Sequence, residues 1–91
     1  MTYKVYVILC EDGSFYTGYS KDVESRMRLH MRGKGARYMR LHKPKKLVYV
    51  EIFNSRVEAM RREKQIKKLN HLQKLELTRS QRETEYDILS D

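Results

Sequence analysis

The sequence predicts a small α/β (α+β) domain in which helices pack on a three-stranded sheet, in the order β-β-α-β-α-α. Three observations lead to this fold class. Two runs rich in β-branched and aromatic residues follow each other closely near the N-terminus, a later run is apolar on both faces, and two helix-capping signals come after it. A length of 91 residues predicts a single domain.

Residues 3–10 and 14–19 predict the two strands of a β-hairpin, because a Glu-Asp-Gly turn separates them. If the loop has three residues with Gly13 in the left-handed conformation, Tyr6 and Tyr16 share one face of the hairpin. A two-residue Asp-Gly loop shifts the register by one residue and places the two tyrosines on opposite faces. Both registers remain open at this stage.

A first helix is predicted from Asp22, as its N-cap, to Gly33. Val23, Met27 and Met31 are spaced four apart along it. Residues of this spacing lie on one side of a helix, so we expect all three to face the core.

Residues 34–44 have no hydrophobic period and contain the only proline, which predicts an exposed, mobile loop. Residues 45–53 have apolar side chains at both odd and even positions. Strands that are buried on both faces show this pattern, so we expect a central strand.

Ser55 and Glu58 form the capping box of a second helix that is predicted to run to about Leu69. Asn70 and Gln73 repeat the signal and open a short third helix.

The charge of the chain is strongly positive and uneven. Lys and Arg number 20 against 12 Asp and Glu, for a net charge of +8. Nine basic residues and no acidic residue lie between Arg26 and Lys46, whereas residues 80–91 carry one basic and four acidic side chains. We therefore expect a basic domain over residues 1–79, followed by an acidic, flexible tail over residues 80–91.

A polyanion is the natural partner of such a basic surface, with binding that weakens as salt rises and does not require sequence specificity. For Tyr38 two alternatives stay open, stacking on an unpaired base and packing on the sheet. The expected nucleic-acid contacts are Arg28, Arg32, Lys34, Arg37, Tyr38, Arg40 and Lys45.

Several classes of protein are excluded by composition. The hydrophobic content of 40% is too high for a disordered chain, and no apolar run approaches the length of a membrane span. The N-terminus lacks the apolar segment of a secretory signal, which predicts a cytoplasmic protein. The single Cys10 is expected to be a small core residue, since it has no partner for an internal disulfide.

The histidines show no zinc-binding spacing with each other or with Cys10, so no structural zinc is expected. His42 and His71 are expected to be solvated, without a role. His30 lies four residues after Arg26, so both project from one face of the first helix. An Arg offers a fork for phosphate and a His a site for a proton, while the alternative is two solvated side chains beside the core.

A carboxylate lies within the apolar arc of the second helix. Glu63 falls in the same half of the helical wheel as Ala59 and Ile66. An isolated buried charge is costly, so Glu63 should bind a metal or be paired. Lys67, one turn further on, offers the alternative of an ion pair within the helix.

Taken together, these positions resemble the GIY-YIG endonuclease family, in particular its short stand-alone bacterial members. The similarity covers roughly residues 3–75. The name-giving motifs correspond to Lys4-Val5-Tyr6 and Tyr16-Thr17-Gly18, with Lys and Thr in place of the family's Gly and Ile. The family's helix-borne Arg and His correspond to Arg26 and His30, and its metal-binding Glu corresponds to Glu63.

The resemblance implies a divalent-metal-dependent endonuclease that hydrolyses phosphodiester bonds in DNA, with one Mg²⁺ or Mn²⁺. Glu63 would hold the metal, and Arg26 would stabilise charge on the phosphate. Tyr16 would position water or phosphate, and either Tyr6 or His30 would take the proton of the attacking water. The substrates would include branched, flapped or damaged DNA in repair or recombination, with a protein partner or a homodimer for targeting.

Two other classes of function compete with this one. A non-catalytic adaptor that binds DNA or RNA explains the charge alone. A protein-interaction module would use the acidic tail to cover its own basic face. Convergence of Tyr6, Tyr16, Arg26, His30 and Glu63 on one cleft favours the enzyme, because a binding module does not need it.

Overall fold

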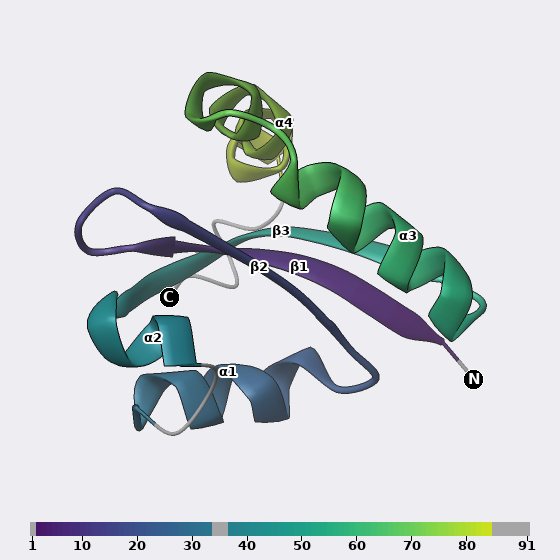
Figure 1. Cartoon of the computed structure of the whole chain (residues 1–91), viewed down its shortest axis with the longest axis horizontal. Helices are drawn as coiled ribbons and strands as arrows, with labels where there is room; N and C mark the ends of the chain where they lie inside the picture. The colour runs from purple at the N-terminus through teal and green to yellow at the C-terminus, as the bar shows by residue number, and fades with distance from the viewer. Residues whose placement is uncertain (1, 34–36, 85–91) are drawn as a thin grey trace.

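The computed structural model describes residues 2–33 and 37–84. Within these residues the elements are β1 (Tyr3–Cys10), β2 (Phe15–Ser20), α1 (Val23–Met31), α2 (Arg37–Leu41), β3 (Pro44–Phe53), α3 (Arg56–Lys67) and α4 (His71–Thr84). The strands form an antiparallel sheet in the order β2-β1-β3. Figure 1 shows α1 and α2 on one side of this sheet and α3 and α4 on the other. The predicted α+β fold class is confirmed, with the short helix α2 added.

The hairpin adopts the register of the three-residue loop. Tyr6 pairs with Gly18 and Ile8 with Tyr16. Gly13 has a φ of 86°, the left-handed conformation that glycine adopts without strain. The two-residue loop is therefore excluded, and the two tyrosines lie on the same face.

The central strand β1 is buried on both faces. Val5 and Val7 pack with Ala59 and Ile66 on the α3 side. Cys10 belongs to the cluster on the α1 side and is 1% exposed, as expected of a core residue. Alternate residues of one strand thus build two cores, which is the pattern of a strand covered by helices on both faces.

β3 was predicted to be central, and this prediction was wrong, because β3 lies at an edge of the sheet. Its pairing with β1 is irregular between Val7 and Ile8. There a bulge turns the consecutive residues Val48 and Tyr49 into the same core cluster. The bulge and the cover provided by α4 explain why β3 is apolar on both faces although it is an edge strand.

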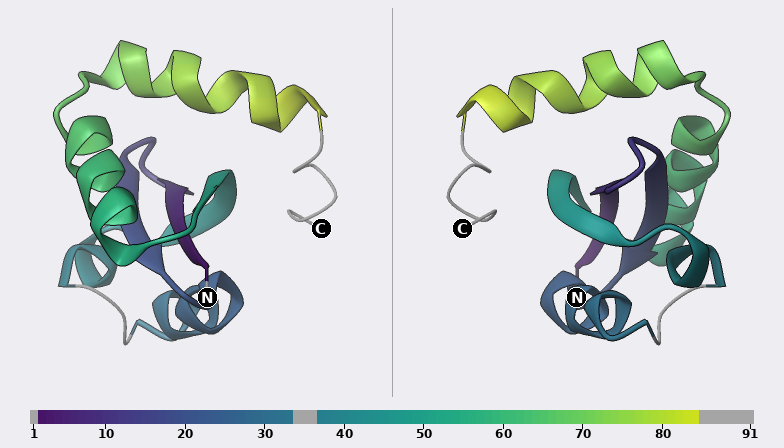
Figure 2. Two further views of the ribbon diagram at one scale, coloured as in Figure 1. Left: turned by 90° about the vertical axis from the view of Figure 1, so that its right-hand side faces the viewer. Right: turned by 90° about the vertical axis from the view of Figure 1, so that its left-hand side faces the viewer.

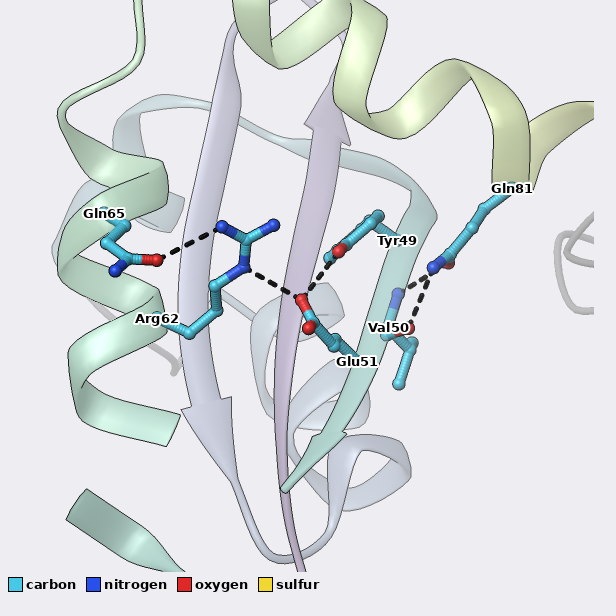
Figure 3. Close-up of polar contacts among 6 residues, drawn as sticks. All are labelled: Tyr49, Val50, Glu51, Arg62, Gln65 and Gln81. Carbon is cyan, nitrogen blue, oxygen red and sulfur yellow. Dashed lines mark hydrogen bonds and ion pairs between the residues drawn. The ribbon is translucent and has the colours of Figure 1, made fainter. Parts of the chain in front are cut away.

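Helix α4 closes the edge of β3. Figure 2 shows α4 crossing over the sheet from the α3 side towards β3. The Gln81 amide accepts a hydrogen bond from the Val50 backbone N at 2.9 Å and donates one to the Val50 backbone O at 3.0 Å (Figure 3). A side chain thereby occupies the position of a neighbouring strand, which protects an edge from pairing with other chains.

α4 is longer than predicted. It continues through Thr84, into the segment that was expected to form the acidic tail. The Gln81 contact ties the start of that segment to the domain. Residues 85–91 of the expected tail lie outside the described residues.

α1 begins and ends as predicted. Asp22 accepts a hydrogen bond from the Ser25 backbone N, and Gly33 follows the helix with a φ of 72°. The expected buried stripe is wrong at one position, because Met31 is 62% exposed whereas His30 is 2% exposed. Residues at positions i, i+4 and i+7 share one face of a helix, as do those at i, i+4 and i+8. In α1 the buried face contains Val23, Met27 and His30.

The predicted loop over residues 34–44 is also corrected. Residues 37–41 form the helix α2, and Pro44 is buried and begins β3. Side-chain packing stabilises this short helix, because Tyr38 lies against the ring of His42 one turn later. Residues 34–36 lie outside the described residues.

The capping signals of the last two helices are confirmed. The Glu58 backbone N donates to Ser55 Oγ, and the Gln73 backbone N donates to Asn70 Oδ1. In the part of the chain that the structure describes, no helix has the length and apolar character needed to cross a membrane.

Replacing Gln81 with alanine is expected to lower the free energy of unfolding by about 1–2 kcal/mol, because two hydrogen bonds to the Val50 backbone are lost. Glu76→Ala, on an exposed part of the same helix, is the control and should change stability by less than about 0.5 kcal/mol. Urea denaturation at neutral pH measures both. Equal stability of the two variants would show that the edge contact contributes nothing.

Candidate active site

The hairpin and two helices surround a cavity of about 580 Å³. The five residues with predicted catalytic roles all line it. The complete lining is Tyr3, Tyr6, Tyr16, Gly18, Tyr19, Ser20, Lys21, Arg26, His30 and Glu63.

The cavity spans the β2 edge of the sheet. Arg26 and His30 come from α1, whereas Glu63 comes from α3 on the opposite side (Figure 1). β2 is an edge strand of the sheet, so side chains from the two helices meet beyond it. The fold therefore brings together groups that are separated by up to 57 positions, from Tyr6 to Glu63, in the sequence.

Gly18 makes room for the centre of the site. A Cβ atom at this position would lie 2.7 Å from Tyr6 Oη and 3.1 Å from Tyr16 Cε2. Real Cβ atoms do not approach other atoms so closely. The absence of a side chain at Gly18 thus allows the Tyr6 hydroxyl to lie across the neighbouring strand, beside the Tyr16 ring.

Tyr6 and His30 are in direct contact. The Tyr6 Oη atom lies 3.1 Å from His30 Nε2, and both residues are buried. His30 Nδ1 is also buried and has no hydrogen-bond partner among the described residues. His30 lines the cavity together with Arg26. The alternative of a solvated His30 beside the core is wrong, because His30 is buried.

The environment keeps this pair uncharged. Burial lowers the pKa of His30, and the nearby positive charge of Arg26 lowers it further. Burial, reinforced by Tyr16, raises the pKa of the Tyr6 phenol. At neutral pH the site therefore contains a neutral imidazole hydrogen-bonded to a protonated phenol.

Tyr16 lies beside this pair. Its ring centroid is 5.3 Å from that of His30 and 6.2 Å from that of Tyr6. Burial raises the pKa of Tyr16, with Glu63 as the second cause. Arg26 opposes the shift, so the charges of both helices act on the same hydroxyl groups.

Glu63 makes the ion pair that was expected as its structural alternative, with Lys67 Nζ 3.6 Å from Glu63 Oε2. The Glu63 side chain is 16% exposed and that of Lys67 is 53% exposed. The carboxylate nevertheless lines the cavity. Glu63 thus contributes to the cavity wall while it is paired with a largely exposed lysine.

The donor set of the cavity fits a metal that is held mainly by substrate and water. Glu63 is the carboxylate in its lining, and the described residues contain no cluster of three or more His, Cys, Asp or Glu. Mg²⁺ retains several waters and is often bound through one or two carboxylates together with phosphate oxygens. One carboxylate next to a phosphate site is consistent with such an ion.

Sequence reasoning missed part of the cavity wall. The sequence patterns assigned no role to four residues that line the cavity, Tyr3, Tyr19, Ser20 and Lys21. Arg56 Nε also donates a hydrogen bond to Tyr19 Oη at 3.2 Å. Their positions next to the two motifs could have indicated this, because Tyr3 directly precedes Lys4-Val5-Tyr6 and the other three directly follow Tyr16-Thr17-Gly18.

One departure from the family motif has a visible consequence. Thr17 is 3% exposed, and its hydroxyl has no hydrogen-bond partner among the described residues. The threonine therefore takes a core position that suits the family's isoleucine better.

Among the described residues, the basic side chains expected to contact nucleic acid do not line the cavity. Lys34 is outside the described residues, and Tyr38 is half-buried against Tyr16. The exposed members are Arg28, Arg32, Arg37, Arg40 and Lys45.

His42 was expected to be solvated, without a role, yet its side chain is only 31% exposed. Its Nδ1 atom is paired with Asp12 Oδ2, and its ring stacks on that of Tyr38. The pattern that could have indicated this contact is the spacing of Tyr38 and His42, one helical turn apart.

The GIY-YIG catalytic domain matches residues 2–76, and the chain belongs to the GIY-YIG family. This is a family of nucleases, hydrolases that act on nucleic acid and typically use divalent metals.

Its relatives include small proteins of the UPF0213 group. A UPF0213 protein of Staphylococcus haemolyticus is 49% identical over 73 residues, which are 80% of this chain and 89% of the relative. The solution NMR structure of a UPF0213 protein of Bacillus halodurans is similar with a TM-score of 0.54 and 45% identity, covering 85% of this chain and 82% of that one. A solution NMR structure from E. faecalis has a TM-score of 0.61 and 37% identity, covering 88% and 85%.

Replacing Gly18 with alanine is expected to displace the Tyr6 hydroxyl and to lower the free energy of unfolding by about 1–3 kcal/mol, because the new methyl group overlaps the phenol. A double-mutant cycle with Tyr6→Phe measures the cause directly. The cost of Gly18→Ala should be smaller in the Tyr6→Phe background, where the closest atom is gone. An equal cost in both backgrounds would contradict the proposed role of Gly18.

Proposed function

We propose that this protein is a divalent-metal-dependent endonuclease that hydrolyses phosphodiester bonds in DNA, with a preference for particular DNA structures such as those of repair or recombination. The observation that carries the proposal is the convergence of Tyr6, Tyr16, Arg26, His30 and Glu63 on the same cavity. A binding module gains nothing from a buried neutral histidine bonded to a tyrosine beside a carboxylate.

Arg26 and Glu63 act on the phosphate from opposite sides of the sheet. The Arg26 guanidinium binds the phosphate and stabilises the charge that develops in the transition state. Glu63 would hold Mg²⁺ or Mn²⁺, which neutralises charge on the phosphate oxygens when bound. Lys67, which is 53% exposed, would move into solvent if Glu63 held the metal.

Tyr6 and His30 move the proton of the attacking water. The raised pKa of Tyr6 disfavours a free phenolate, and the lowered pKa of His30 leaves its imidazole neutral and able to accept. The contact between Tyr6 Oη and His30 Nε2 supports a relay: Tyr6 donates its proton to His30 as it takes one from water. Tyr16 orients the water or the phosphate.

The basic surface retains the rest of the strand. Arg28 and Arg32 lie in and just after α1, Arg37 and Arg40 lie in α2, and Lys45 lies near the start of β3. Lys34 is outside the described residues. Phosphate contacts of this kind position the substrate without reading its sequence. Residues 1–79 would form the catalytic domain of a cytoplasmic enzyme, and residues 80–91 would carry its acidic end. A protein partner or a second copy would supply targeting.

A non-catalytic adaptor for DNA or RNA is the second candidate. The observation that favours it is the Glu63–Lys67 ion pair, which satisfies the carboxylate without a metal. Under this alternative the protein binds nucleic acid and leaves it intact.

Cleavage of labelled DNA and RNA distinguishes the two functions. The panel contains single-stranded, duplex, flap and branched substrates, each with Mg²⁺, Mn²⁺ or EDTA. We expect metal-dependent cleavage that falls by about 100-fold or more in Glu63→Gln, with binding retained, because that residue acts on the reacting phosphate. Glu76→Gln, an exposed carboxylate on α4, is the matched control and should cleave like the unaltered protein.

Binding without cleavage on every substrate would establish the adaptor. Cleavage that is equal in Glu63→Gln and in the control would retain the nuclease and remove Glu63 from its mechanism.

A further inference from the structure

The loop of the hairpin is tied to the segment that follows α2. The Glu11 backbone N donates a hydrogen bond to the Lys43 backbone O at 2.8 Å. Next to it, Asp12 Oδ2 pairs with His42 Nδ1 at 2.5 Å. The β1–β2 loop and the end of α2 are therefore joined by a backbone contact and a side-chain contact at the same place.

The Asp12 carboxylate is fixed before it meets the histidine. The Ser14 backbone N and Ser14 Oγ both donate to Asp12 Oδ1, at 3.0 Å and 2.6 Å. These bonds, with the His42 contact as the second cause, hold the pKa of Asp12 well below its usual range. A charged carboxylate with one oxygen occupied by the loop presents the other oxygen to His42.

The contact continues through aromatic rings into the site. The His42 ring stacks on that of Tyr38, with a centroid separation of 4.1 Å and an angle of 20°. The Tyr38 ring in turn lies 5.7 Å from that of Tyr16. Tyr16 lines the cavity, and Tyr38 is not among its lining residues. Tyr38 therefore reaches the cavity wall through the ring of Tyr16.

We propose that Asp12, His42 and Tyr38 are positioning residues that hold the Tyr16 ring in its catalytic orientation. This inference rests on the proposed nuclease function, in which Tyr16 orients water or phosphate. Tyr16 is half-buried and lies on the edge strand β2, which has a neighbouring strand on one side only. Part of its ring is therefore not covered by the sheet. Helix α2 supplies that support, and the Asp12–His42 pair fixes α2.

Helix α2 also packs on the sheet through Tyr38, which lies against the core cluster of Tyr6, Ile8, Cys10 and Val23. Neighbouring Leu41, on the same helix, is 79% exposed and takes no part in the chain of contacts. It therefore provides a matched control for a change within α2.

Steady-state cleavage by variants tests the proposal. Tyr38→Ala and His42→Ala should lower kcat by about 10- to 100-fold, since small displacements of a positioned group have effects of this size. KM should change by less than about twofold, because the exposed basic side chains are retained. Tyr38→Phe keeps the ring and should restore kcat, and Leu41→Ala should have no effect.

A second readout does not depend on activity. The aromatic NMR resonances of Tyr16, identified by their loss in Tyr16→Phe, should shift in Tyr38→Ala and His42→Ala, and should keep their positions in Tyr38→Phe and Leu41→Ala. Asp12→Asn, which retains the size of the side chain, should produce the same shift to a smaller extent and serves if an alanine variant does not fold.

Unchanged Tyr16 resonances in folded Tyr38→Ala, His42→Ala and Asp12→Asn would overturn the proposal, and so would an unchanged kcat where cleavage is observed. If the unaltered protein cleaves nothing, the proposed function fails, while the NMR comparison still decides whether these residues hold Tyr16. The two failures are thereby distinguishable.

Discussion

The cross-strand pairing of Tyr6 with Gly18 determines where every other group of the site lies. It follows from the three-residue loop, in which Gly13 takes a positive φ. In that register the Tyr6 hydroxyl occupies the space of the missing side chain, meets His30 and lies beside Tyr16. A shift of one residue would turn the two tyrosines to opposite faces and would leave Arg26 and Glu63 without a common partner.

Around this pair the fold combines a buried, uncharged centre with a charged periphery. His30 and Tyr6 are kept neutral by burial, while Arg26 and Glu63 approach the cavity from two sides of the sheet. A proton acceptor that is neutral before the substrate arrives, next to an arginine, suits a reaction on an anionic phosphate. Two further contacts hold this arrangement in a small domain. Helix α2 supports Tyr16 through the ring of Tyr38, and Gln81 closes the edge of β3.

The hairpin, the helix starts and the five polar positions were predictable from local signals. These signals are the turn residues, the capping residues and the family motifs, and each depends on only a few neighbouring residues. Long-range contacts defeated the other predictions. β3 was predicted to be central because its run of apolar residues reveals neither its bulge nor its contact with α4. Met31 was expected to be buried because it is apolar. The structure buries His30 instead, which is hydrogen-bonded to Tyr6, 24 residues away in the sequence. The environment of His42, at the end of α2, includes Asp12 from the β1–β2 loop, which is distant in the sequence.

The most direct test of convergence is to add Mn²⁺ to the labelled protein and to follow which backbone amides its paramagnetism broadens. The account predicts that amides of the cavity wall, Gly18 and Arg26 among them, broaden first, and that Glu63→Gln abolishes the effect. The acidic residues of the segment 80–91 are the control for non-specific cation binding. Broadening confined to that segment, or unchanged by Glu63→Gln, would contradict the claim that Tyr6, Tyr16, Arg26, His30 and Glu63 form one metal-dependent site.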